Sequence, residues 1–330
     1  MAYEIVLVAF DECVGLSLHG PADLFSTANS ITQMQGGTAK LFNTKIISFD
    51  GRNVLSSNGH EIVVDGDFSK IVSPAVIMLP GFSAESLKEF NNKLNSLDQL
   101  IQKIPKYAKE DVLMAATCTG TLLLGKSGML DGKSATTTWW LQEFYQELFP
   151  KVELNTNEIL VEDGHCITSA AGASSLDLTL HIIAKFAGPH LSRECAKYLM
   201  IDNDRLSQRT YSTQWHLKTR DPLIEKADAW IRNNLQSSCK VNELADHLGV
   251  SARTLLRRFQ KQQGMTPQEY IQDTKMDQAK FLLESSDYTV GAVAQQCGFS
   301  DENAFRRSFT QKVQLSPVKY RKKFKSSQVQ

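Results

Sequence analysis

Hydrophobic residues in the first two-thirds of the chain gather in short continuous runs, which alternate with segments of helical periodicity. The runs cover residues 5–10, 45–49, 61–64, 75–79 and 112–116, and the helical segments cover residues 24–29, 86–104 and 120–127. Strands that are apolar throughout and alternate with helices are typical of a parallel sheet covered on both faces. The pattern therefore predicts an α/β fold with a doubly wound, mostly parallel sheet.

The last third of the chain has a different pattern, in which one helix-turn-helix motif occurs twice. Each copy carries a small residue for close helix contact, a glycine for a turn with positive φ, and an apolar residue that fills the turn. These are Ala245, Gly249 and Val250 in the first copy and Ala294, Gly298 and Phe299 in the second. A serine follows each turn, Ser251 or Ser300, and we expect it to cap the next helix. One such pattern would suit a helical hairpin in a core, but two matching copies predict a tandem, all-α DNA-binding domain.

The second helix of each copy is the one expected to enter the major groove. The residues placed to contact DNA are Ala252, Arg253, Thr254 and Arg257 in the first copy and Asp301, Glu302, Asn303, Arg306 and Arg307 in the second. Among them, Arg253 is suited to guanine and Asn303 to adenine. Between the copies, Pro267 opens a segment of helical spacing at residues 268–284, which predicts a rigid connecting helix.

The two motifs, at residues 244–267 and 293–324, resemble the DNA-binding domain of AraC/XylS-type transcription regulators. The resemblance implies seven helices and two recognition helices that enter successive major-groove segments on one face of double-stranded DNA.

The charge distribution agrees with a DNA partner, although the whole chain has no net charge. Residues 221–330 carry 17 Lys and Arg against 12 Asp and Glu. The basic run at residues 319–325, which includes Lys322, would suit either a solvated terminal helix or phosphate contact, and we favour phosphate contact.

Cysteine and histidine spacing excludes several other classes of protein. The six cysteines are scattered without a Cys-x-x-Cys pair, and the histidines lack metal spacing, so we expect no zinc site, no disulfide scaffold and no cofactor. The first ten residues lack the features of a signal peptide, and no apolar stretch approaches the roughly 20 residues that span a bilayer. We expect a soluble, cytoplasmic protein without membrane contact.

The clearest candidate pocket lies where the predicted strands end, because ligands of open α/β sheets bind outside the carboxyl ends of the strands. Cys118 stands between a buried strand and a helix start of small residues. This resembles a nucleophile elbow, where the helix N-terminus is expected to lower the pKa of a thiol. Gly81 follows another strand and could bring a backbone N–H to the same point. A randomly chosen cysteine is more often a small buried hydrophobe, but this position favours a pocket.

Further motifs widen the resemblance to the class I glutamine amidotransferase-like domain of the PfpI superfamily. They are Gly20-Pro21, Pro80-Gly81, Cys118-Thr-Gly120, residues 128–132, residues 135–140 and residues 168–172 with Asp177. The resemblance spans residues 3–190, and its fusion to an AraC-type reader is similar to the GlxA family of transcription regulators.

The chain departs from the catalytic members of that superfamily at the positions that matter for chemistry. Thr119 stands where the protease-like members have histidine, and Ser17 best matches the position of an assisting carboxylate, although Asp11 or Glu12 could reach. A thiol without a base is a poor catalyst, so we expect no catalytic residue and no enzyme activity. The predicted ligand-binding residues are Ser17, Gly81, Phe82, Cys118, Thr119, Trp139 and Trp140. Either tryptophan would also suit core packing, and Asp177 is expected to be a structural group.

Two other functions stay open at this point. The front domain could be a cysteine-dependent hydrolase, hydratase or amidotransferase-like enzyme, or Cys118 could be a redox sensor.

The predicted organisation is a ligand-sensing domain at residues 1–200, a polar linker at 201–220 and the DNA-binding domain at 221–330. The resemblance further implies a homodimer and a small-molecule effector that contains nitrogen, such as an amino acid or a small amine.

Overall fold

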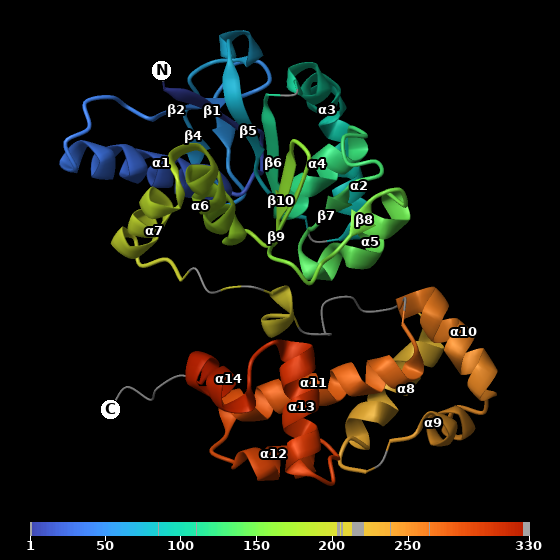
Figure 1. The fold of residues 1–330 in the computed structure, drawn as a ribbon. Helices are drawn as coiled ribbons and strands as arrows, with labels where there is room; N and C mark the ends of the chain where they lie inside the picture. Colours follow the sequence, from blue (N-terminus) through green and yellow to red (C-terminus); the bar gives the residue numbers. More distant parts are fainter. Residues whose placement is uncertain are drawn as a thin grey trace. The chain divides into compact units, whose positions relative to one another are not determined.

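The computed structural model describes residues 2–84, 86–109, 111–202, 205, 207–212, 221–237, 239–263 and 265–325. It divides into two compact units, Met1–Gln208 and Arg209–Gln330 (Figure 1). Much of the predicted linker, including Asn203, Thr213 and Gln214, lies outside the described residues, as does Gly264 at the end of the first helix-turn-helix copy.

The first unit is built on a six-stranded sheet in the order β2-β1-β5-β6-β10-β9. The strands are β1 (Tyr3–Val8), β2 (Phe42–Ile47), β5 (Pro74–Leu79), β6 (Leu113–Thr117), β9 (Leu160–Asp163) and β10 (Cys166–Ser169). All neighbouring strands are parallel except β9, which pairs antiparallel with β10. The prediction of a mostly parallel α/β fold is confirmed. The carboxyl ends of β1, β5, β6 and β10 consequently lie at one edge of the sheet.

Helices cover both faces of this sheet. The helices α1 (Leu16–Met34), α6 (Ser174–Ala187) and α7 (Pro189–Tyr198) pack on one another over one face, and α2 (Leu87–Ser96), α3 (Asp98–Lys103), α4 (Thr121–Lys126) and α5 (Gln142–Leu148) lie on the other (Figure 1). The central strands are fully apolar and buried, as in β6, because both faces are covered.

Two elements differ from the sequence prediction. Residues 61–64 do not join the main sheet: β4 (Glu61–Ile62) pairs only with β3 (Val54–Leu55), and the Val63 side chain is exposed. The helix predicted at residues 86–104 is broken at Leu97, next to Asn95, Ser96 and Asp98, whose side chains compete for backbone hydrogen bonds. A further short pair, β7 (Ser134–Ala135) with β8 (Glu153–Leu154), was not predicted.

The second unit contains seven helices among its described residues, the number that the AraC/XylS resemblance implies. They are α8 (Pro222–Asn233), α9 (Val241–His247), α10 (Ala252–Gln263), α11 (Pro267–Ser285), α12 (Val290–Gln296), α13 (Glu302–Val313) and α14 (Pro317–Phe324). The long helix α11 runs through both halves of this unit (Figure 1). It buries Tyr270 and Ile271 in a core with α8–α10, and Met276, Ala279 and Leu283 in a core with α12–α14. The predicted connecting helix is present.

The two turn glycines of the helix-turn-helix motifs both have positive φ, +65° at Gly249 and +70° at Gly298. Their surroundings differ. A Cβ atom on Gly249 would meet nothing within 4 Å, whereas a Cβ on Gly298 would overlap the carbonyl oxygen of Leu235 at the end of α8. The second turn therefore packs directly against the first half of the unit.

This difference predicts unequal effects of the same substitution. Gly249→Ala should reduce the free energy of unfolding by about 1 kcal/mol, the strain of a left-handed residue with a side chain. Gly298→Ala should cost about 3 kcal/mol, because strain and overlap add. Urea unfolding of the two full-length variants measures the difference, and equal losses would contradict the packing described for Gly298.

Candidate effector site and nucleic-acid interface

Cys118 occupies the strand-turn-helix corner that its position in the sequence predicted. The strand β6 ends at Thr117, Cys118 has φ +57°, and α4 begins at Thr121 after a short 3₁₀ turn. A non-glycine residue with positive φ is uncommon, and this geometry is that of a nucleophile elbow.

The loop after β5 closes tightly on this corner. A Cβ atom on Gly120 would overlap the carbonyl oxygen of Pro80, and a Cβ on Gly81 would lie 3.2 Å from the Cβ of Cys118. The Thr119 hydroxyl donates to the carbonyl oxygen of Phe82 at 2.7 Å and accepts from its backbone N–H at 2.5 Å. Gly81, Cys118 and Thr119 are thus brought together. The Phe82 side chain is buried beside Phe10 and Phe90, so it belongs to the core.

The thiol itself is not activated. Burial raises the pKa of Cys118 to about 11, and the hydrogen bonds from Thr119 and from the backbone of Gly172 only partly oppose this rise. The expectation that the helix N-terminus lowers this pKa is therefore wrong. The physical reason is that desolvation outweighs the N–H groups of a helix only six residues long.

The acidic residues near the site have other partners. Asp11 accepts a hydrogen bond from the Leu55 backbone N–H, and Glu12 pairs with Lys93 at 2.5 Å. Ser17 is buried in the first turn of α1, and its hydroxyl has no partner among the described residues. Asp177 forms an ion pair with Arg205 at 2.6 Å, in agreement with a structural role.

Two threonine hydroxyls bond the backbone of the elbow, and other buried hydroxyls of this unit have no described partner. The side chains of Thr121 and Thr137 both donate to the carbonyl oxygen of Cys118, at 2.7 and 3.0 Å. Thr138 and Ser175 are fully buried, and like Ser17 their hydroxyls have no partner within the described part of the chain. Buried polar groups ordinarily have a hydrogen-bond partner, so these hydroxyls are available to water or to a ligand. Thr137, Thr138 and Ser175 are not among the predicted ligand-binding residues, although the threonine run at 136–138 is visible in the sequence.

The two tryptophans have different surroundings. Trp140 packs on Phe90 with ring centroids 5.9 Å apart and joins the hydrophobic core. The backbone N–H of Trp139 donates to the Oε1 atom of Gln208 at 3.0 Å. Both remain half-buried.

In the first recognition helix, α10, the arginines face solvent. Leu255 and Phe259 are fully buried, while Ala252, Arg253 and Arg257 are exposed and Thr254 is half-buried. The Ser251 hydroxyl accepts from the Thr254 backbone N–H at 3.1 Å, which confirms it as a helix cap.

In the second recognition helix, α13, acidic groups have structural roles. The cap is Asp301, which accepts from the backbone N–H groups of Asn303 and Ala304, so the prediction of Ser300 as the cap is wrong. A carboxylate accepts both N–H groups at once, which a serine one residue earlier does not. Glu302 pairs with Arg306 at 2.6 Å, and Asn303 and Arg307 are exposed.

The basic C-terminal helix α14 is anchored at several points. The Tyr320 hydroxyl donates to Glu284, Arg321 donates to the carbonyl oxygen of Tyr288, and Lys325 pairs with Asp287. Lys322 is exposed. Of the basic run, Lys322 is thus well placed for an outside partner.

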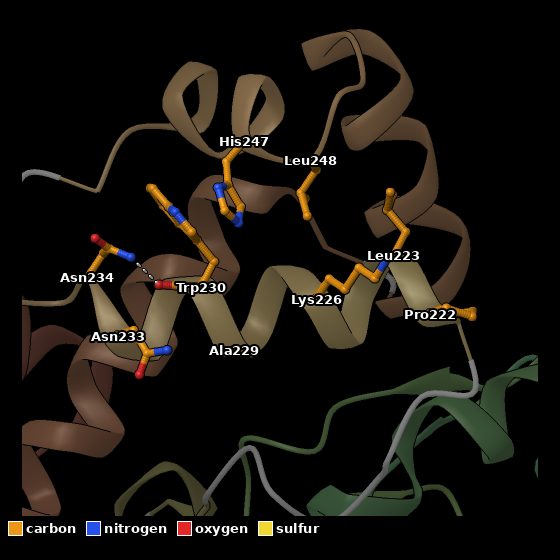
Figure 2. Close-up of a pocket in the computed structure, with 9 residues that line it drawn as sticks. All are labelled: Pro222, Leu223, Lys226, Ala229, Trp230, Asn233, Asn234, His247 and Leu248. Carbon is orange, nitrogen blue, oxygen red and sulfur yellow. Dashed lines mark hydrogen bonds between the residues drawn. The ribbon is translucent and has the colours of Figure 1, made fainter.

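A separate groove of about 640 Å³ lies between α8 and α9 (Figure 2). Trp230 and His247 form one wall, with ring centroids 5.6 Å apart, and Lys226 extends along α8. None of the predicted DNA-contacting residues lines this groove.

The described residues hold no group of three His, Cys, Asp or Glu side chains that could bind a metal ion. Within the described ranges, every helix is too short or too polar to cross a membrane.

Comparison with known proteins identifies relatives of both units. Residues 4–185 match the DJ-1/PfpI family, and residues 244–323 match a helix-turn-helix domain family. The HTH-type transcriptional regulator CdhR of Pseudomonas aeruginosa is 28% identical over 84% of this chain and 81% of its own length. The regulator GbdR of the same species is 26% identical over 93% of this chain and 83% of its own length. A crystal structure of a candidate transcriptional regulator from Vibrio parahaemolyticus matches 60% of this chain and 100% of its own length, with 18% identity and a TM-score of 0.50.

The raised thiol pKa predicts how Cys118 reacts. Because only the thiolate is nucleophilic, alkylation of Cys118 by iodoacetamide should accelerate about tenfold per pH unit between pH 7 and 9.5. Mass spectrometry of the full-length protein measures the rate, with Cys118→Ser as the control for the other cysteines. A rate that is already maximal near pH 7 would contradict the burial described for this thiol.

Proposed function

The chain belongs to the DJ-1/PfpI family and joins that domain to an AraC-type helix-turn-helix domain, and from this premise we propose that a small molecule bound near Cys118 controls its activity as a DNA-binding transcription regulator. The observation that carries the proposal is a family-type elbow whose thiol has a raised pKa and, among the described residues, no histidine or carboxylate partner. An elbow of this kind keeps the backbone geometry of the family's site but lacks an activated nucleophile. Control by a bound ligand is the use of the site that agrees with both features.

We propose that the front domain binds its effector without converting it. The ligand contacts would come from Ser17, Gly81, Cys118 and Thr119, with Trp139 and Trp140 as walls, whereas Phe82 packs in the core. The unpartnered hydroxyls of Ser17, Thr138 and Ser175 support a polar ligand, and a nitrogen-containing metabolite would supply donors for them. The DJ-1/PfpI fold also includes enzymes, so turnover of a substrate that disappears in Cys118→Ser would overturn this part of the proposal.

For the DNA-binding unit, we propose that α10 and α13 enter neighbouring segments of the major groove. Arg253 would contact guanine and Asn303 adenine. Lys322 would bind phosphate. The contact would be completed by other residues of the two helices and their caps: Arg257, Arg306, Arg307, Ala252, Thr254, Asp301 and Glu302. A homodimer would present four such helices to the operator.

Two substitutions test the assignment of base and phosphate contacts. An operator is first selected from a randomised duplex library with the wild-type chain. Arg253→Ala should then weaken binding to this operator by about 1–3 kcal/mol while changing binding to a scrambled duplex little. Lys322→Ala should weaken both duplexes evenly and reduce the salt dependence. Dissociation constants from fluorescence anisotropy decide, and equal losses on both duplexes in both variants would remove the base-reading role of Arg253.

A metabolite screen by thermal shift tests the effector site on the full-length chain. A ligand at 100 times its dissociation constant should stabilise the front domain by about 2.7 kcal/mol. Ser17→Ala should reduce that shift without lowering the midpoint of the free protein, because this hydroxyl has no partner to lose among the described residues. Ser192→Ala is the matched control: its buried hydroxyl donates to the Leu180 carbonyl oxygen, so the free midpoint should fall and the ligand shift should persist.

A further inference from the structure

Two of the last residues of the first unit are bonded to Thr137 or to Ala173, which follows Gly172, and Thr137 and Gly172 are themselves bonded to Cys118: Gln208 bonds Thr137, and Arg205 bonds Ala173. We propose that Arg205, Ser207 and Gln208 form a strap that reports the state of the Cys118 site to the DNA-binding unit. The inference rests on the proposed function, because it assumes that the site is occupied during regulation. To the proposed function it adds the structural element that would respond to a ligand at this site.

Gln208 is the main anchor of the strap. Gln208 is 3% exposed, and the two hydrogens of its Nε2 group are shared among three acceptors: the Thr136 hydroxyl at 3.1 Å, the Thr137 carbonyl oxygen at 2.8 Å and the Glu158 carbonyl oxygen at 2.9 Å. Its Oε1 atom accepts from the backbone N–H of Trp139. A buried amide with these partners is held in one position, because moving it would break several hydrogen bonds at once.

The backbone reinforces this anchor. The N–H of Gln208 donates to the carbonyl oxygen of Asn157 at 2.8 Å, and the Ser207 hydroxyl donates to the same oxygen at 2.9 Å. Ser207 also forms an isolated antiparallel bridge with Glu158. The strap is therefore fixed by main-chain as well as side-chain bonds.

Arg205 forms the second anchor, at the start of α6. Its guanidinium donates to the carboxylate of Asp177 at 2.6 Å and to the Ala173 carbonyl oxygen at 3.4 Å. Both side chains of the ion pair are largely buried, with exposed fractions of 20% and 13%.

Each anchor is connected to Cys118 through one residue or two. On one side, Thr137 donates its hydroxyl to the Cys118 carbonyl oxygen and accepts Gln208 on its own carbonyl oxygen. On the other side, the Gly172 backbone bonds the Cys118 thiol, and the next residue, Ala173, accepts Arg205. A molecule that moves the backbone of Thr137 or of Gly172 and Ala173 would therefore lengthen or break a bond that holds the strap.

The chain that continues from the strap is fixed within the second unit. The ammonium group of Lys280 on α11 donates to the carbonyl oxygens of Arg209 at 3.0 Å and Ser212 at 2.5 Å. The Thr210 hydroxyl donates to the Val313 carbonyl oxygen at the end of α13. Gln208 and Arg209 are adjacent in the sequence, so displacement of Gln208 acts through one peptide bond on a segment attached to α11 and α13.

The test compares two Gln208 variants with a matched glutamine elsewhere in the same unit. Gln208→Glu keeps the size of the side chain but presents carboxylate oxygens to two carbonyl oxygens, and Gln208→Ala removes the side chain. Gln142→Ala is the control, because Gln142 accepts a single hydrogen bond, from Thr156. Hydrogen exchange of peptides covering residues 205–212 is measured in the full-length chain, together with the dissociation constant for the selected operator.

We expect both Gln208 variants to raise exchange in these peptides at least about tenfold and to change the dissociation constant at least about fivefold, and the control to do neither. Treatment of the wild type with methyl methanethiosulfonate, which adds a methylthio group to Cys118, should reproduce both effects, and Cys118→Ser should prevent them. If modification changes DNA binding while the strap stays protected, the strap is refuted and the proposed function stands. If modification releases the strap without changing DNA binding, the strap does not act on the DNA-binding unit and is likewise refuted. If modification changes neither property while both Gln208 variants change both, control through Cys118 is refuted and the strap stands. Wild-type exchange and affinity in both Gln208 variants would also overturn the strap.

Discussion

The candidate site depends on the close approach of the loop after β5 to the start of α4. Only glycine at position 120 leaves room for the carbonyl oxygen of Pro80, and this contact brings Gly81 against Cys118. The Thr119 hydroxyl then bonds both backbone groups of Phe82. Two strand ends are locked together in this way, with the half-buried Cys118 at the corner between them. The same closure that forms the site raises the pKa of the thiol.

The two predicted recognition helices differ in charge at their N-terminal ends, although the motifs that contain them match in sequence. On α10, Arg253 and Arg257 are exposed and face no acidic neighbour at the start of the helix. On α13, Asp301 caps the helix and Glu302 pairs with Arg306. Because phosphate attraction dominates the affinity of DNA-binding proteins, we expect the first helix to contribute more affinity and the second to contribute mainly selectivity.

The sequence contained most of the fold and the position of the site, because these follow from local patterns. Apolar runs predicted β1, β5 and β6, and the repeated Ala–Gly spacing predicted both helix-turn-helix motifs. The strands β9 and β10 were missed because they are short and carry polar residues such as Glu162 and Thr168. The thiol pKa, the Thr137 and Gln208 contacts and the Asp301 cap depend on residues distant in sequence or on one-residue shifts in a helix start. The periodicity of apolar residues reveals neither contacts between distant residues nor the exact first residue of a helix.

Helix α11 places one limit on the DNA that this chain can recognise. It contributes side chains to the cores of both halves of the second unit, and Gly298 fits against the end of α8. The distance and rotation between α10 and α13 are consequently fixed within the protein. Each base pair inserted between the two contacted segments of DNA rotates one segment by about 34° relative to the other. A spacer of variable length would therefore require the duplex, and not the protein, to twist.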